Sequence, residues 1–233
     1  WNEKEGRYNW ELVFCELYAG GKYDNESSEN YEFSLGLNGL GSCATQYASR
    51  YMDVTVWREG KEYSLHFERG EIVGQMSVRE QSGKKRTGTR IRWLPDLEVF
   101  TDIDIPAEYY REVLRRQAVV NAGVTFRLRC EVAPGKFETE DFLYEHGIRD
   151  YLAELAGEDP LTEPVCWETE RRGRDRVDKP EYKVKLNIAW CFSNRVHLIE
   201  HYHNSSFLEY GGSPDKATRL AFVYAIAQYP NEN

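Results

Sequence analysis

Three glycines at the spacing G-x-x-G-x-G mark the stretch best suited to chemistry, the run Gly36-Leu37-Asn38-Gly39-Leu40-Gly41. Glycine lets the backbone turn sharply and approach a ligand closely. A helix that begins directly after such a loop points its unpaired N–H groups and its positive dipole end at the loop, which suits a phosphate chain. The alternative interpretation is a tight turn before a buried helix, and the glycines alone leave both open.

The sequence around the glycines excludes two common phosphate-binding folds. A dinucleotide-binding fingerprint needs a hydrophobic strand just before the glycines, whereas residues 24–30 are polar. A Walker loop ends in Gly-Lys-Ser/Thr, but Gly41 is followed by Ser42 and Cys43. What remains is a long lid, from about Gly20 to Leu35, that could close over a bound nucleotide.

The elements that must position this loop are two helices and a set of strands. Apolar spacing predicts a helix over Asn9–Tyr18, capped by Asn9, and another from about Ser42 to Tyr51. Alternating residues predict strands at 54–57, 63–67, 75–79 and 90–93, with a hairpin turn at Glu59-Gly60-Lys61. The basic run 81–86 between the last two strands is typical of a solvated turn. We expect His66, between Leu65 and Phe67, to have a structural or surface role.

The rest of the chain also mixes helices and strands. Pro106 predicts the start of a helix that runs to about Val120, with Gly123 just beyond its end. Further along, the pattern predicts paired strands at 124–131 and 137–144, joined by a turn at Pro134-Gly135. It then predicts a helix at 148–156, strands at 165–170 and 182–192, and a helix from Ser213-Pro214 to about Tyr229.

Three motifs in order resemble the nucleotide motifs of the bacterial gyrase B and topoisomerase IV B subunits, within the GHKL group of ATPases. They are the run from Glu16 to Asp24, the glycine run 36–41, and Lys85-Arg86-Thr87-Gly88-Thr89. The resemblance continues through Phe100-Thr101, residues 115–124 and 210–212, and so covers essentially the whole chain. Asn38 stands where the family usually has His, and its amide can still donate and accept hydrogen bonds.

This resemblance implies an α+β fold in two parts. Residues 1–145 would be the back part of a GHKL (Bergerat) ATP-binding α/β sandwich. Residues 146–233 would be the start of a transducer domain with a ribosomal-protein-like βαβ fold. The family's catalytic Glu, its Mg-binding Asn and its adenine-reading Asp lie upstream of the lid, and its transducer Lys lies beyond Asn233. We therefore expect a fragment with no catalytic residue of its own, which would not turn over ATP alone.

The resemblance also implies the residues that bind ATP. Lys22 would neutralise phosphate charge from the lid, Tyr31 would approach the adenine or ribose, and Thr89 would form a hydrogen bond near the adenine. Taken alone, these three residues also fit a solvated turn, a packing contact and an ordinary strand position. The complete set comprises Lys22, Tyr31, Gly36, Leu37, Asn38, Gly39, Leu40, Gly41 and Thr89.

The function implied by the resemblance is the ATP-binding portion of the B subunit of a cytoplasmic, ATP-hydrolysing type II DNA topoisomerase. Its cofactors would be ATP and Mg²⁺, the metal held by residues outside this chain. Its partners would be a second B subunit, a gyrase A-type subunit and double-stranded DNA, with no membrane contact. The alternatives are another GHKL ATPase, of the mismatch-repair or chaperone type, and a non-enzymatic interaction module on the same fold.

The charge and the distribution of cysteines and histidines restrict the possible functions further. The net charge of −9 argues against broad nucleic-acid binding by this piece, although it leaves room for a local basic patch. The five cysteines are scattered without a C-x-x-C pair, which favours free thiols. His197, His201 and His203 lie beside Glu200 and could bind zinc, but their spacing matches no standard site and favours a polar loop.

Overall fold

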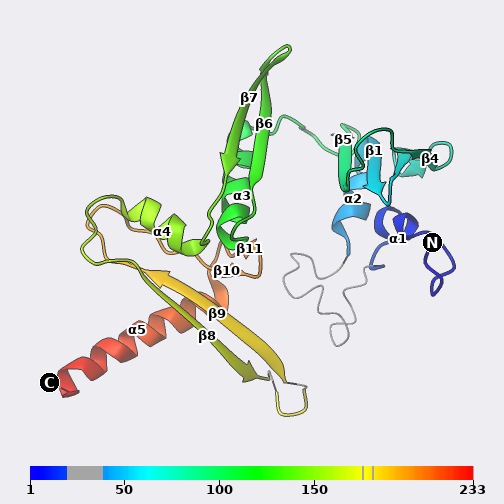
Figure 1. Cartoon of the computed structure of the whole chain (residues 1–233). Helices are drawn as coiled ribbons and strands as arrows, with labels where there is room; N and C mark the ends of the chain where they lie inside the picture. The colour runs from blue at the N-terminus through cyan, green and yellow to red at the C-terminus, as the bar shows by residue number, and fades with distance from the viewer. Residues whose placement is uncertain (20–38, 175, 180, 233) are drawn as a thin grey trace. The chain divides into compact units, whose positions relative to one another are not determined.

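The computed structural model describes residues 1–19, 39–174, 176–179 and 181–232 (Figure 1). These residues form two compact units, Trp1–Ile105 and Pro106–Asn233, each with its own hydrophobic core. Helices and mainly antiparallel strands occur in both units, so the predicted α+β class is confirmed. Among the helices of the described ranges, none is both long and apolar enough to cross a bilayer.

The first unit is built on an antiparallel sheet in which β1 (Ser49–Arg58) lies between β2 (Lys61–Glu68) and β5 (Gly88–Pro95). The other edge of β2 pairs with two short strands, β3 (Glu71–Ile72) and β4 (Ser77–Glu80). The predicted hairpin between β1 and β2 is confirmed. Its two turn residues, Glu59 and Gly60, both have positive φ, 53° and 77°, as the right-handed twist of a two-residue hairpin requires.

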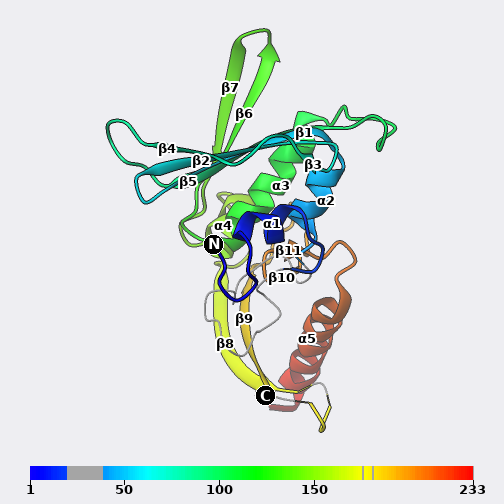
Figure 2. The same ribbon diagram turned by 90° about the vertical axis from the view of Figure 1, so that its right-hand side faces the viewer.

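One face of this sheet carries the core. Met52 and Val54 on β1 pair directly with Phe67 and Leu65 on β2, and all four side chains are buried. The helix α1 (Asn9–Phe14) covers them through Phe14, whose ring centroid lies 5.9 Å from that of Phe67. The second helix, α2 (Gly41–Tyr47), contacts both α1 and β1, and Figure 2 shows both helices below the strands.

Both helices are shorter than the sequence predicts. The N-cap of α1 is Tyr8 rather than Asn9, and its N–H donates to the Glu11 carboxylate over 2.7 Å. The predicted end at Tyr18 is wrong because Tyr18 has φ +63°, which a right-handed helix cannot contain. The predicted end of α2 at Tyr51 is also wrong, because Ser49 already begins β1.

A buried carboxylate ties the β2–β3 turn to the segment after β5. Asp96 is only 6% exposed, and its carboxylate accepts from Arg69 Nε at 2.9 Å. The Arg69 side chain also reaches Glu98 at 2.9 Å. Among the described residues, Arg69 is the cationic partner of Asp96, and it is itself half-exposed.

We expect Arg69→Ala to lower the free energy of unfolding by about 1–3 kcal/mol, because a buried carboxylate would lose its charged hydrogen-bond donor. Urea unfolding followed by circular dichroism measures this loss. The control is Arg58→Ala, which removes an exposed ion pair with Glu59 and should change stability by less than about 0.5 kcal/mol. Equal losses in the two variants would contradict the prediction.

The second unit contains the predicted elements in the predicted order, together with one short strand pair that the sequence did not predict. Helix α3 (Ala107–Val120) begins after Pro106 and packs on the long hairpin of β6 (Phe126–Ala133) and β7 (Lys136–Phe142). Next come α4 (Ile148–Ala156), a second hairpin of β8 (Val165–Gly173) and β9 (Tyr182–Trp190), the short pair β10 (Tyr202–His203) and β11 (Ser206–Phe207), and α5 (Gly212–Glu232). Both views show β8 and β9 running side by side (Figures 1 and 2).

The core of this unit lies between α3, the β6–β7 hairpin and α4. Ala118, Val119, Phe142 and Tyr144 are its buried members. The side chain of Gln117 donates to the carbonyl of Ser205 over 2.8 Å and so ties α3 to the turn of the β10–β11 pair. The predicted division at residues 1–145 and 146–233 falls inside this unit and remains a prediction about the family's two domains.

Candidate nucleotide site

The predicted ATP-binding residues divide between described and undescribed parts of the chain. Five of them lie outside the described residues, namely Lys22, Tyr31, Gly36, Leu37 and Asn38. Gly39, Leu40, Gly41 and Thr89 are described, and all four belong to the first compact unit.

The end of the glycine run forms a turn directly before α2. Gly39 has φ +60°, a conformation that glycine adopts at no steric cost and a β-branched residue avoids. Leu40 is the N-cap, and its carbonyl accepts from the Ala44 N–H at 2.8 Å. A side chain at Gly41 would meet no atom within 4 Å. Gly39 is therefore the described position at which this turn requires glycine.

Thr89 lies on the helix-covered face of the sheet. It pairs with Val56 of β1, and two residues further along Ile91 pairs with Val54. Because successive strand residues point to opposite faces, Thr89 and Ile91 share the face of Met52 and Val54, which α1 covers. Thr89 therefore shares a face with the core of this sheet, whereas the glycine run ends in the turn directly before α2, at the opposite end of β1 from Val56.

The part of this face on β5 is open in the described structure. Ile91 and Trp93 are 40% and 47% exposed, and both share the face of Thr89. A hydroxyl beside exposed apolar side chains is the composition expected of a small-molecule site, in which few polar groups fix orientation. A flat heterocycle could lie on these side chains while Thr89 donates or accepts a hydrogen bond.

A buried polar side chain on α2 could not be predicted from the sequence. Gln46 is 1% exposed, and neither its amide nitrogen nor its oxygen has a hydrogen-bond partner among the described residues. Leaving such a group unpaired costs about 1–3 kcal/mol. Helical spacing alone placed Gln46 on α2 without showing that its side chain would be enclosed.

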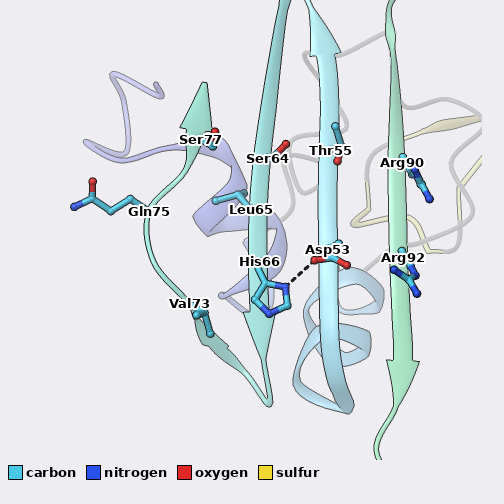
Figure 3. Close-up of a pocket in the computed structure, with 10 residues that line it drawn as sticks. All are labelled: Asp53, Thr55, Ser64, Leu65, His66, Val73, Gln75, Ser77, Arg90 and Arg92. Atoms are coloured by element: carbon cyan, nitrogen blue, oxygen red, sulfur yellow. Dashed lines mark hydrogen bonds and ion pairs between the residues drawn. The ribbon is translucent and has the colours of Figure 1, made fainter. Parts of the chain in front are cut away.

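The opposite face of the sheet is polar and has no predicted role (Figure 3). Its groove, of about 400 Å³, includes Asp53, Thr55, Ser64 and His66. His66 Nδ1 lies 2.6 Å from Asp53 Oδ1, and Nε2 lies 3.2 Å from Glu68 Oε1. The hydrogen bond to Asp53 first, and that to Glu68 second, raise the pKa of His66 above its usual value. These contacts give His66 a structural role between β1 and β2, as expected.

We expect this arrangement to make stability depend on pH. Because the folded state raises the pKa of His66, its contribution is complete below the unfolded pKa of about 6.5 and is lost as pH rises through the raised pKa. The side chain is 38% exposed, so the contribution is at most about 1 kcal/mol. The stability gap between the wild type and His66→Gln should narrow between pH 6 and pH 9 in chemical unfolding. A constant gap would contradict the prediction.

The three C-terminal histidines do not come together. His201 Nε2 lies 3.3 Å from Asp215 Oδ1 and joins the loop to α5, whereas His203 is on β10. Across the described ranges, no group of three or more His, Cys, Asp or Glu side chains is arranged to hold a metal ion.

Comparison with known proteins shows the class of protein to which this chain is related. No protein-family model matches the chain. It is 32% identical over 207 residues to the DNA gyrase B subunit of Synechocystis sp. (strain ATCC 27184 / PCC 6803 / Kazusa), a match that covers 84% of this chain and 18% of the relative. It is 36% identical over 152 residues to the DNA topoisomerase 4 B subunit of Escherichia coli (strain K12), with coverage of 65% and 23%.

The fold agrees with the sequence matches. The chain is similar to the crystal structure of the 43K ATPase domain of Thermus thermophilus gyrase B in complex with an aminocoumarin, with a TM-score of 0.55 and 25% identity. That match covers 72% of this chain and 40% of the other. Fold and motifs thus define a chain related to the ATPase region of type II DNA topoisomerase B subunits.

Within that class, its relatives are the gyrase B and topoisomerase IV B subunits, and the resemblance seen in the sequence motifs is confirmed. The chain spans only 18% to 32% of the length of these relatives.

Proposed function

We propose that the chain forms part of the ATP-binding region of a type II DNA topoisomerase B subunit. The observation that supports this proposal is a fold similar to the gyrase B ATPase domain, with 25% identity, in a chain whose glycine run ends at the turn before α2. In the whole protein, ATP binding and hydrolysis would drive DNA strand passage.

Each predicted residue has a chemical task in this proposal. Backbone N–H groups of Gly36, Leu37, Asn38, Gly39, Leu40 and Gly41 donate to the triphosphate, and close approach requires glycine at this turn. Lys22 supplies a compact positive charge to the phosphates. Tyr31 and Thr89 contact the ribose or adenine, and Ile91 lies beside Thr89 under the base.

The remaining parts of the machinery are proposed for the whole subunit. Mg²⁺ would bridge the phosphates and be held by residues outside this chain, since phosphoryl transfer needs both a metal and an oriented water. Residues 1–145 would belong to the ATPase domain and residues 146–233 to the transducer. A second B subunit, a gyrase A-type subunit and a DNA duplex would be the partners, in the cytoplasm.

Two other functions remain as competitors. A mismatch-repair or chaperone type of GHKL ATPase would share the nucleotide site, but the relatives named above are topoisomerase B subunits. A non-enzymatic interaction module would share the fold and bind no nucleotide. Nucleotide binding therefore separates the proposal from the second competitor, and DNA relaxation by the assembled enzyme separates it from the first.

The decisive experiment is a melting curve of the full-length subunit with Mg²⁺ and a non-hydrolysable ATP analogue. A ligand at 100 times its Kd stabilises the folded state by about 2.7 kcal/mol, which raises the melting temperature measurably. No shift of the full-length subunit with the analogue at millimolar concentration would overturn the proposal.

In the full-length subunit, we expect Lys22→Ala to weaken binding of the ATP analogue several-fold, because the loss of one ammonium removes charge compensation at the phosphates. Isothermal titration calorimetry measures the affinity. The control Lys4→Ala removes an exposed lysine of the N-terminal turn and should leave the affinity unchanged. Equal affinities in the wild type and Lys22→Ala would remove Lys22 from the site.

A further inference from the structure

Six basic side chains gather on and beside the polar face of the first sheet, in a chain that is acidic overall. This basic patch comprises Arg79, Lys84, Lys85, Arg86, Arg90 and Arg92. Within the described part of the chain, none of the six forms an ion pair. The six positive charges are therefore available to an external anion. Screening over about 8–10 Å limits the opposing effect of the acidic residues elsewhere in the chain.

The turn that carries three of these residues is fixed to the β1–β2 hairpin. The Gln81 N–H donates to the Gly60 carbonyl at 2.8 Å. The Gln81 side-chain nitrogen donates to the carbonyls of Lys61 and Arg86, each over 3.0 Å. Its oxygen accepts from the Arg86 N–H at 2.9 Å. The solvated turn expected from the sequence is exposed, but its backbone is anchored.

Two of the basic side chains pack against the β1–β2 hairpin. The guanidinium of Arg86 lies 3.8 Å from the ring centroid of Trp57, and Trp57 Nε1 donates to Glu62 over 2.7 Å. The Lys85 side chain crosses over Gly60, where an added Cβ would come within 3.0 Å of it. A patch that is ordered before binding loses little conformational entropy when it binds.

The spacing of two arginines on β5 matches the spacing of charges along a polyanion. Arg90 and Arg92 are two residues apart on the same face of the strand, roughly 6.6–6.8 Å along it, and Figure 3 shows them one above the other. This separation suits neighbouring phosphates of one nucleic-acid strand. Thr55 pairs with both Ser64 and Arg90, so hydroxyl groups lie beside the arginines in the groove. Arginine, serine and threonine are usual donors to DNA phosphates.

The chemistry favours nucleic acid over a protein partner. The core of a protein interface is enriched in aromatic and other apolar anchors. Here Arg90 lies beside the hydroxyls of Thr55 and Ser64, and Asp53, opposite Arg92, is hydrogen-bonded to His66. The aromatic ring of Trp57 is covered by Arg86. A basic, hydroxyl-lined and pre-ordered surface instead fits a phosphate backbone, whose recognition depends on charge rather than on burial.

We propose that the basic patch contacts the phosphate backbone of a DNA duplex directly and without sequence preference. The patch lies mainly on the face opposite Thr89, so this contact is separate from the proposed nucleotide site and needs no ATP. It goes beyond the proposed function, in which DNA is engaged through the assembled holoenzyme.

The test is fluorescence anisotropy of the whole chain with labelled DNA duplexes of two unrelated sequences, without nucleotide, from 50 to 200 mM salt. Four phosphate contacts predict a slope of roughly −3.6 in log affinity against log salt, or about a hundredfold loss over this range. The double variant R90A/R92A should weaken binding to both duplexes equally and reduce the slope by roughly 1.8. Its melting temperature should match that of the wild type.

The control is R149A/R195A, which removes two exposed arginines of the second unit and should leave the slope unchanged. No binding at 50 mM salt, equal losses in the two double variants, or tighter binding to poly-glutamate than to DNA would each overturn the proposal. The nucleotide-induced melting shift of R90A/R92A should equal that of the wild type. The outcome for DNA is therefore read independently of the outcome for ATP.

Discussion

Phe67→Ala should unfold the first compact unit, with a loss of about 3–5 kcal/mol in the free energy of unfolding. Phe67 is 0% exposed and lies between α1 and the sheet. Its ring contacts Phe14 and Trp10, with centroid distances of 5.9 and 6.2 Å. Truncation would remove buried apolar surface and leave a cavity that the paired strands cannot close. A loss of this size is a large fraction of the stability of a small domain.

Hydrogen exchange followed by mass spectrometry locates the effect. Amides of β1 and β2 should lose protection in Phe67→Ala, whereas those of α3 and the β6–β7 hairpin, which belong to another core, should keep theirs. The control Leu97→Ala truncates a side chain that is 64% exposed and should change stability by less than about 0.5 kcal/mol. Loss of protection in both units would show that they unfold together.

In the full-length subunit, Gly39→Val should reduce affinity for the ATP analogue more than tenfold. At φ +60° a β-branched residue is strained, so the turn before α2 would change its path and withdraw its N–H groups from the phosphates. This effect should exceed that of Lys22→Ala, because it displaces several donors instead of one charge.

Calorimetry with the ATP analogue measures the affinity, and a melting curve checks the fold. The matched control is Gly123→Val, which introduces the same kind of strain at φ +75° in the second unit, where an added Cβ meets no atom within 4 Å. Both variants should lose some stability, and only Gly39→Val should lose nucleotide binding. Unchanged affinity in Gly39→Val would exclude this turn from the site.

The sequence alone predicted the structure wherever a few neighbouring residues determine the backbone conformation. Pro106 predicted the start of α3, Pro134-Gly135 predicted the β6–β7 turn, and Glu59-Gly60 predicted the β1–β2 turn. In each case a residue with restricted or unusually free φ decides the conformation within a few positions. The motif order that identified the relatives is likewise a property of the sequence itself.

Tertiary structure decided the features that depend on distant residues. The helical pattern continued past Tyr47, but α2 stops there because Ala48 accepts a hydrogen bond from Asp96 and Ser49 enters the sheet. In any strand the side chain of Thr89 points to the face opposite its two neighbours. Only the pairing with Val56 shows that this face is the one that carries the core.

The same holds for the basic patch. The sequence showed a run of basic residues, while the bonds from Gln81 to Gly60, Lys61 and Arg86 and the stacking of Arg86 on Trp57 showed that the run is fixed in place. Local propensity acts over a few residues, whereas register, burial and charge clustering arise when strands far apart in the chain become neighbours.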